Sequence, residues 1–315
     1  MRATVLAALA IAAVVPLVTA GLGGGEFYLG FATRIVIFAI AATSLNLILG
    51  YGGLVSLGHA AFFGLAAYGV GILVAHGVDT AAIQWPVALA ACAVFAAVTG
   101  LVVLRTSGIY FIMITLAFAQ MLYFLFVSLR QYGGDDGLTI ATRSRLGPID
   151  LGEPVVLYYL SVLCLVGSLW FCHRLVASRF GMVIRGARTN TRRMAALGFP
   201  VFRYQLVAFV LAGVMCGVAG ILQANLTQFV SPSYMAWARS GELIVMVVLG
   251  GMGTLFGPVL GAAALLILEE VLADWTVHWM LYLGPIIVLI VLFAKRGLIG
   301  LFDRRSPPPA GGHHG

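Results

Sequence analysis

Charged residues are scarce in this chain of 315 residues: they make up 9% of it, whereas globular domains carry about 25%. In their place, 62% of the residues are hydrophobic. Several apolar runs reach the roughly 17–25 residues that an α-helix needs to cross a bilayer. This composition excludes an ordinary soluble domain and indicates a polytopic membrane protein.

Lysine is almost absent, since Lys295 is the only one and Ala294 precedes it. A phosphate-binding loop of the form G-x-x-x-x-G-K-[ST] needs glycine before its lysine, so this chain cannot hydrolyse ATP by that route. The motif H-E-x-x-H is missing too, and no Ser–His–Asp set can be argued from the spacing. The cysteines lie in apolar runs without a C-x-x-C pair, which indicates small buried hydrophobic residues rather than disulfides or metal ligands. They are Cys92, Cys164, Cys172 and Cys216.

What is abundant is continuous apolar sequence. The runs cover about residues 3–20, 27–49, 54–75, 84–104, 109–128, 154–173, 204–226, 241–273 and 275–294. Because they do not alternate with period two, helices are favoured over a β-barrel, and we expect an all-α transmembrane bundle of about 8–10 spans. We expect the first run to be a retained helix; a cleaved signal peptide is the alternative.

Arginine is unevenly distributed. Seven arginines and no acidic residue lie between Arg174 and Arg203. Lys295, Arg296, Arg304 and Arg305 follow the last run. Both segments are expected to be cytoplasmic, since basic loops stay on that side, and the net charge of +7 is a topology signal rather than a nucleic-acid-binding face. We therefore divide the chain into a transmembrane domain, 1–302, with a cytoplasmic loop at 174–203, and a flexible cytoplasmic tail, 303–315.

Two glycine-rich breaks interrupt the apolar runs. If 174–203 and the C-terminal end share one side, the chain between them crosses an even number of times, yet three runs are visible. The run 241–273 is too long for one span, and splitting it at 250–258 into two short crossings or a re-entrant pair restores parity. The similar wording at 49–54 predicts two related halves, as in transporters built from repeats. The predicted break residues are Gly50, Gly52, Gly53, Gly250, Gly251, Gly253, Gly257 and Pro258.

Polar residues near these breaks are candidates for a substrate path. Irregular backbone and polar groups at membrane depth are costly unless they are buried in protein or line a cavity. The path candidates are Asn46, Ser56, His59, Thr115 and Gln120. For His59, a hydrogen bond within the bundle is the alternative. Arg34, Glu269 and Glu270 lie toward span ends, so they give little support to ion coupling. The G-x-x-x-G patterns at 213–217 and 253–261 predict internal helix packing, or else an interface within the membrane.

The basic loop contains a helix-compatible stretch at 190–198. Asn190 or Thr191 can cap its N-terminus, and Gly198 suits the position after its C-terminus. Such a short helix, with small residues flanked by arginines, would form a protruding knob that another protein can bind. A loop resting on anionic lipid headgroups is the alternative.

Four segments in order closely resemble the permeases of branched-chain amino acid ABC importers, and the combination is similar to the LivM-type subunit rather than its LivH-type partner. They are 44–64, 108–120, 133–138 and 249–258. The resemblance spans about 27–302. It implies a permease that pairs with a homologous LivH-like permease, two cytoplasmic ATPases and an extracytoplasmic substrate-binding protein in the bacterial inner membrane. It also implies that ATP and Mg are bound by the ATPases, with no cofactor, metal or catalytic residue in this chain.

The resemblance places the ATPase-coupling helix within 188–198. The corresponding residues are Arg188, Asn190, Arg192, Arg193, Ala195, Ala196 and Gly198. The family usually has acidic residues just after the arginine, and here the order is Arg188-Thr-Asn-Thr191. We therefore expect a partner ATPase whose groove is less basic or more acidic. An ion-coupled secondary transporter is the alternative function, and the substrate cannot be named from the wall residues.

Overall fold

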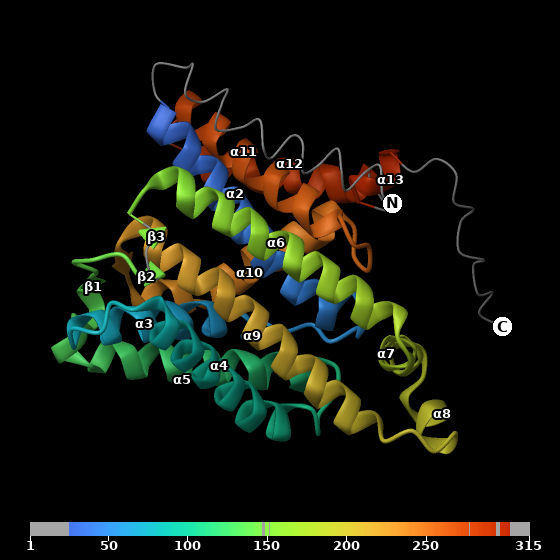
Figure 1. Ribbon diagram of the computed structural model, residues 1–315. Coiled ribbons are helices and arrows are strands. Elements are labelled where there is room, and N and C mark those ends of the chain that lie inside the picture. The colour runs from blue at the N-terminus through green and yellow to red at the C-terminus, as the bar shows by residue number, and fades with distance from the viewer. Residues whose placement is uncertain (1–24, 147–148, 151, 277, 294–296, 303–315) are drawn as a thin grey trace.

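The computed structural model describes residues 25–146, 149–150, 152–276, 278–293 and 297–302, so the first apolar run and the predicted tail lie outside the described residues. The longer helices are α2 (Gly25–Asn46), α3 (Ala60–Ala75), α4 (Ala81–Val103), α5 (Ile109–Ser128), α6 (Pro154–Ala177), α9 (Val201–Thr227), α10 (Trp237–Gly250), α11 (Gly257–Trp275) and α12 (Trp279–Phe293). The shorter helical segments are η1 (Leu47–Tyr51), η2 (Arg130–Tyr132), η3 (Gly134–Asp136), α7 (Arg179–Thr189), α8 (Thr191–Ala196), η4 (Pro232–Met235) and α13 (Ile299–Phe302). The predicted helical bundle is confirmed (Figure 1).

Two small antiparallel strand pairs lie at one end of this bundle. β1 (Leu138–Thr139) pairs with β4 (Phe229–Val230), and β2 (Arg145–Leu146) pairs with β3 (Ile149–Asp150). Figure 1 shows α7 and α8 at the opposite end. We call these the strand end and the α8 end.

Five helical segments in the described part of the chain are long and apolar enough to cross a bilayer by themselves. They are α2 continued by η1, α4, α5, α6 and α9. α3 and the stretch Trp279–Ile290 of α12 are shorter apolar helices. The expected 8–10 spans thus have five full-length counterparts, and the other long helices are shorter or, like α11, carry acidic residues near one end.

Helices α2 and α9 form the centre of the bundle. α9 packs against α2, α3 and α4, while α2 also packs against α6 and α11. Close approach depends on glycine: a Cβ at Gly220 of α9 would lie 2.0 Å from the carbonyl oxygen of Phe63 on α3. Gly213 and Gly217 face α3 and α4 in the same way, so the predicted internal packing is confirmed. α4, α5 and α6 expose much of their apolar surface, as expected for helices that face lipid.

The long run 241–273 is broken where the sequence predicts. α10 ends at Gly250 and α11 begins at Gly257. A Cβ at Gly250 would lie 1.8 Å from the Gly257 carbonyl oxygen, and one at Gly261 would lie 1.8 Å from that of Met246. These pairs run in opposite directions, so α10 and α11 form a tightly packed antiparallel hairpin. α10 and α11 thus run in opposite directions, as the two short crossings and the re-entrant pair both require.

The segment after α12 returns to the α8 end. The amide of Leu298 donates a hydrogen bond to the carbonyl oxygen of Leu249, 2.8 Å away, at the tip of α10. The chain from α9 through α12 thus makes four passes, and the arginine-rich loop and the end of α12 lie at the same end of the bundle, as the arginine distribution predicts.

Candidate functional site

The first break follows directly from α2. The helix widens into the π-helical turn η1, and the chain then leaves the helix at Gly52 and Gly53 before α3 begins. A Cβ at Gly52 would lie 2.6 Å from the carbonyl oxygen of Ile48, and Gly53 has a φ of 72°. Glycine is therefore needed at both positions, because any other side chain would clash or strain the backbone. π-type turns inside helices occur frequently at functional sites.

The second break is the connection between α10 and α11. Gly251 has a φ of 120° and Gly253 a φ of 75°, and Pro258 occupies the first turn of α11. A turn of this kind leaves backbone groups without a partner in either helix. At membrane depth those groups must be satisfied by protein.

Asn46, at the end of α2, forms hydrogen bonds to these backbone groups and so joins the two breaks. Its side-chain nitrogen donates to the carbonyl oxygen of Thr254, 2.8 Å away, and its Oδ1 accepts from the amide of Gly253 at 2.9 Å. Asn46 is 1% exposed, and its neighbour in the π-turn, Gly50, has no room for a Cβ beside it and Gly253. Segments about two hundred residues apart are therefore held together by one buried amide.

Arg188 extends the same cluster to the basic loop. From the last turn of α7, its Nη1 donates a hydrogen bond to the carbonyl oxygen of Gly50. Its side chain also packs against Gly53, where a Cβ would lie 2.8 Å from the Arg188 Cγ. The resemblance places Arg188 in an ATPase contact; in the structure the residue is exposed, and its guanidinium group bonds to Gly50 where the breaks meet. Asn46, Gly50, Gly53, Arg188 and Gly253 are called the break junction below.

The short helix α8 has the features expected from the sequence. The Oδ1 of Asn190 accepts a hydrogen bond from the amide of Arg193 at 2.9 Å and so caps the helix. Gly198 follows the C-terminal cap with a φ of 86°. The remaining predicted contact residues are exposed on this helix: Arg192, Arg193, Ala195 and Ala196. α8 is therefore a protruding knob (Figure 1).

α7 connects this knob to the bundle. Its inner face buries Gly181, Val183, Ile184 and Ala187, and it contacts α6, α9 and η1. Met194 of α8 packs on α7 so closely that a Cβ at Gly186 would lie 2.7 Å from its sulfur atom. α7 is therefore in contact with both α8 and the break junction.

Most of the predicted path residues gather around the segment 54–59. His59 is fully buried, and its Nε2 lies 2.8 Å from the Ser44 hydroxyl. The Thr115 hydroxyl of α5 accepts a hydrogen bond from the amide of Leu57 at 3.3 Å, and Ser56 is also buried. These side chains hold the segment in place from α2 and α5.

Gln120 lies apart from this group. It is half-buried on α5, and five residues beyond Thr115 correspond to about 140° of rotation around the helix. The structure also brings together residues that the sequence assigns to no site. One pocket is lined by Arg34, Gln223 and Glu270. Gln223 could have been identified from the sequence, because it is a glutamine inside the apolar run 204–226.

Comparisons with known proteins agree with this architecture. Residues 27–294 match the family described as the permease component of branched-chain amino acid transport systems. The chain is 28% identical over 295 residues to the high-affinity branched-chain amino acid transport system permease proteins LivM of Salmonella typhimurium and Escherichia coli, covering 85% of this chain and 69% of each relative. It is 29% identical over 284 residues to the autoinducer 2 import system permease protein LsrC of an Enterobacter species, covering 84% and 79%. No solved structure matches the chain. This multi-pass membrane protein therefore belongs to the family of permease components of branched-chain amino acid transport systems.

Proposed function

We propose that this chain is the LivM-like membrane subunit of an ATP-driven importer of branched-chain amino acids. Its partners are a LivH-like permease, two cytoplasmic ATPases that bind ATP and Mg, and an extracytoplasmic binding protein. The loop 174–203 and the C-terminal end face the cytoplasm, so the strand end faces outward. The observation that carries the proposal is the match of residues 27–294 to the permease components of branched-chain amino acid transport systems.

The geometry supports a defined route for coupling. α8 is exposed, capped and small enough to enter a groove on an ATPase, and α7 is packed on the bundle. When ATP binding moves the ATPases, α8 moves α7, and the Arg188–Gly50 contact carries the motion to both breaks. The α10–α11 hairpin and the α2–η1 segment then shift as rigid bodies between inward-open and outward-open states.

The charge of α8 specifies its partner surface. The knob carries Arg192 and Arg193 and no acidic residue, which favours an ATPase groove that is less basic or more acidic. Arg192→Glu should weaken ATP-coupled uptake, and a compensating Lys or Arg in the groove should restore it. Failure of every such pair would contradict an acidic groove.

The proposal is tested with the chain copurified with its partner subunits and reconstituted in proteoliposomes. L-leucine uptake should require the binding protein and ATP on the α8 side, and it should persist when an ionophore collapses ion gradients. Uptake that continues without ATPases but stops with the ionophore would instead establish an ion-coupled secondary transporter.

A further inference from the structure

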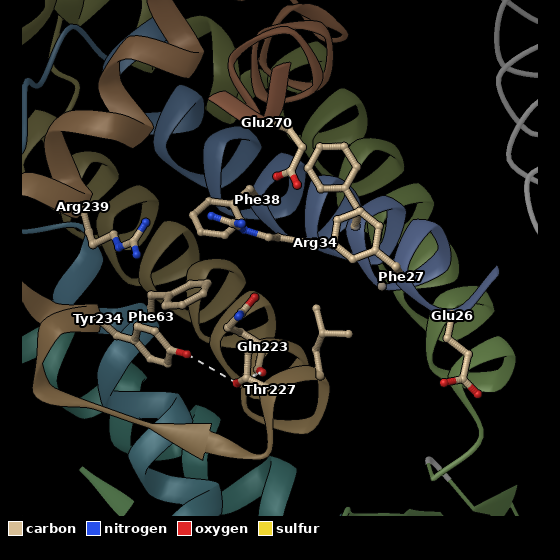
Figure 2. A pocket seen from close by; sticks show the side chains of 13 residues that line it. Glu26, Phe27, Arg34, Phe38, Phe63, Gln223, Thr227, Tyr234, Arg239 and Glu270 are labelled. Carbon is tan, nitrogen blue, oxygen red and sulfur yellow. Dashed lines mark hydrogen bonds between the residues drawn. The ribbon is translucent and has the colours of Figure 1, made fainter. Parts of the chain in front are cut away.

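A pocket of about 540 Å³ opens between α2, α3, α9, η4, α10 and α11 (Figure 2). The pocket lies toward the strand end: one of its lining residues is Thr227, the last residue of α9, just before β4. Its volume falls within the range of about 300–1,000 Å³ typical of small-molecule sites. None of the predicted path residues lines it.

Charges of both signs line this pocket. Figure 2 shows Arg34 projecting from α2 between Glu270 of α11 and Gln223 of α9, with Arg239 of α10 across the space. Within the described part of the chain, the one ion pair joins Arg239 to Glu242 at 2.7 Å. Arg34 instead lies over the ring of Phe38, 5.8 Å from its centroid. Arg34 and Glu270 are half-buried and form no direct ion pair with each other, so both charges are available to a ligand in the pocket.

Gln223 is a further polar residue in the wall of this pocket. It is 5% exposed, it lines the pocket, and its Oε1 makes no hydrogen bond within the described structure. Because this oxygen is covered by neighbouring protein atoms, a ligand in the pocket does not reach it.

The walls are apolar between these polar groups. They are formed mainly by Phe27, Phe31, Phe38, Phe63, Leu226 and Tyr234. A ligand that satisfies all of these features carries a carboxylate, an ammonium group and an apolar side chain. We propose that this pocket binds an apolar α-amino acid as its zwitterion. Arg34 pairs with the carboxylate, Glu270 receives the ammonium group, and the aromatic walls contact the side chain.

This assignment rests on the proposed function for its place in transport. If the strand end faces outward, the pocket receives the amino acid before it passes toward the break junction. The site would then give the permease a selectivity of its own, in addition to that of the binding protein.

Binding can be measured on the full chain in lipid nanodiscs with radiolabelled L-leucine. Competition by L-leucinamide, which lacks the carboxylate, and by 4-methylpentanoate, which lacks the ammonium group, should each be weaker than that of L-leucine by about tenfold or more. Arg34→Gln should abolish the discrimination against leucinamide, and Glu270→Gln that against 4-methylpentanoate. Arg130→Gln, at an exposed arginine of η2, is the matched control and should keep both ratios.

Ratios within one variant do not depend on the fraction of correctly folded protein, so loss of folding cannot imitate the expected result. No saturable leucine binding by the parent chain, or unchanged ratios in both variants, would overturn the assignment. The parallel uptake assay separates the two proposals. ATP-dependent uptake with unaltered selectivity in Arg34→Gln and Glu270→Gln would refute the pocket alone. Selective binding combined with ATP-independent uptake would refute the proposed function alone.

Discussion

Asn46→Leu tests the connection between the two breaks. Leucine has a similar volume but cannot hydrogen-bond, so the amide of Gly253 and the carbonyl of Thr254 would both lose their partner. A buried backbone group left without a partner costs about 1–3 kcal/mol. Since Gly253 and Thr254 are only half-buried, water can partly replace the lost bonds, and we expect the two together to lower the free energy of unfolding by about 2–3 kcal/mol.

The assay is equilibrium unfolding of the purified chain in mixed micelles, followed by circular dichroism. Gln120→Leu is the matched control, because this half-buried amide makes no hydrogen bond in the described structure; its effect should stay within about 0.5 kcal/mol. Uptake by Asn46→Leu should also fall, because the breaks are no longer held together. Equal stability of Asn46→Leu and the parent, or an equal loss in Gln120→Leu, would refute the reasoning.

Three further predictions concern single positions. Gly250→Ala should lower the free energy of unfolding by about 3 kcal/mol, because the added Cβ would lie 1.8 Å from the Gly257 carbonyl oxygen. Gly241→Ala is the control in the same helix: its Cβ has free space, so the free energy of unfolding should rise by about 0.5–1 kcal/mol. Gln223→Leu should raise the free energy of unfolding by about 1 kcal/mol, because it removes a buried unpaired oxygen; a lower free energy of unfolding would contradict this. Asn190→Ala should speed amide hydrogen exchange in α8 through loss of its cap, worth about 1 kcal/mol, without changing the melting temperature of the bundle; equal exchange would contradict the cap.

The sequence predicts the fold well where a local signal exists. Apolar length locates the helices, and the arginine-rich loop together with parity requires the break that the structure has between Gly250 and Gly257. The cap of α8 is also local, because Asn190 and Gly198 act on residues within four positions of themselves. Each of these features is encoded in one short segment, so it can be recognised from that segment alone.

The contacts that join distant segments are not predictable in this way. Nothing local indicates that Asn46 binds Gly253 and Thr254, or that Arg188 reaches Gly50. Arginine in a basic loop is expected to face water or lipid headgroups, so the contact of Arg188 with Gly50 depends on how α7 packs. The relation between the two halves, and the roles of Ser56, His59 and Thr115 in a path, stay predictions.

The most direct test of the coupling route is the number of leucine molecules imported per ATP hydrolysed by the reconstituted complex. Arg188→Gln removes the hydrogen bond to Gly50, while Arg185→Gln is the control, since Arg185 bonds only to carbonyl oxygens of Val176 and Gly181 nearby in the chain. We predict that Arg188→Gln keeps ATP hydrolysis but lowers this ratio by about tenfold, the equivalent of roughly 1.4 kcal/mol, and that Arg185→Gln leaves it unchanged. An unchanged ratio in Arg188→Gln, or an equal fall in both variants, would contradict the role of the break junction.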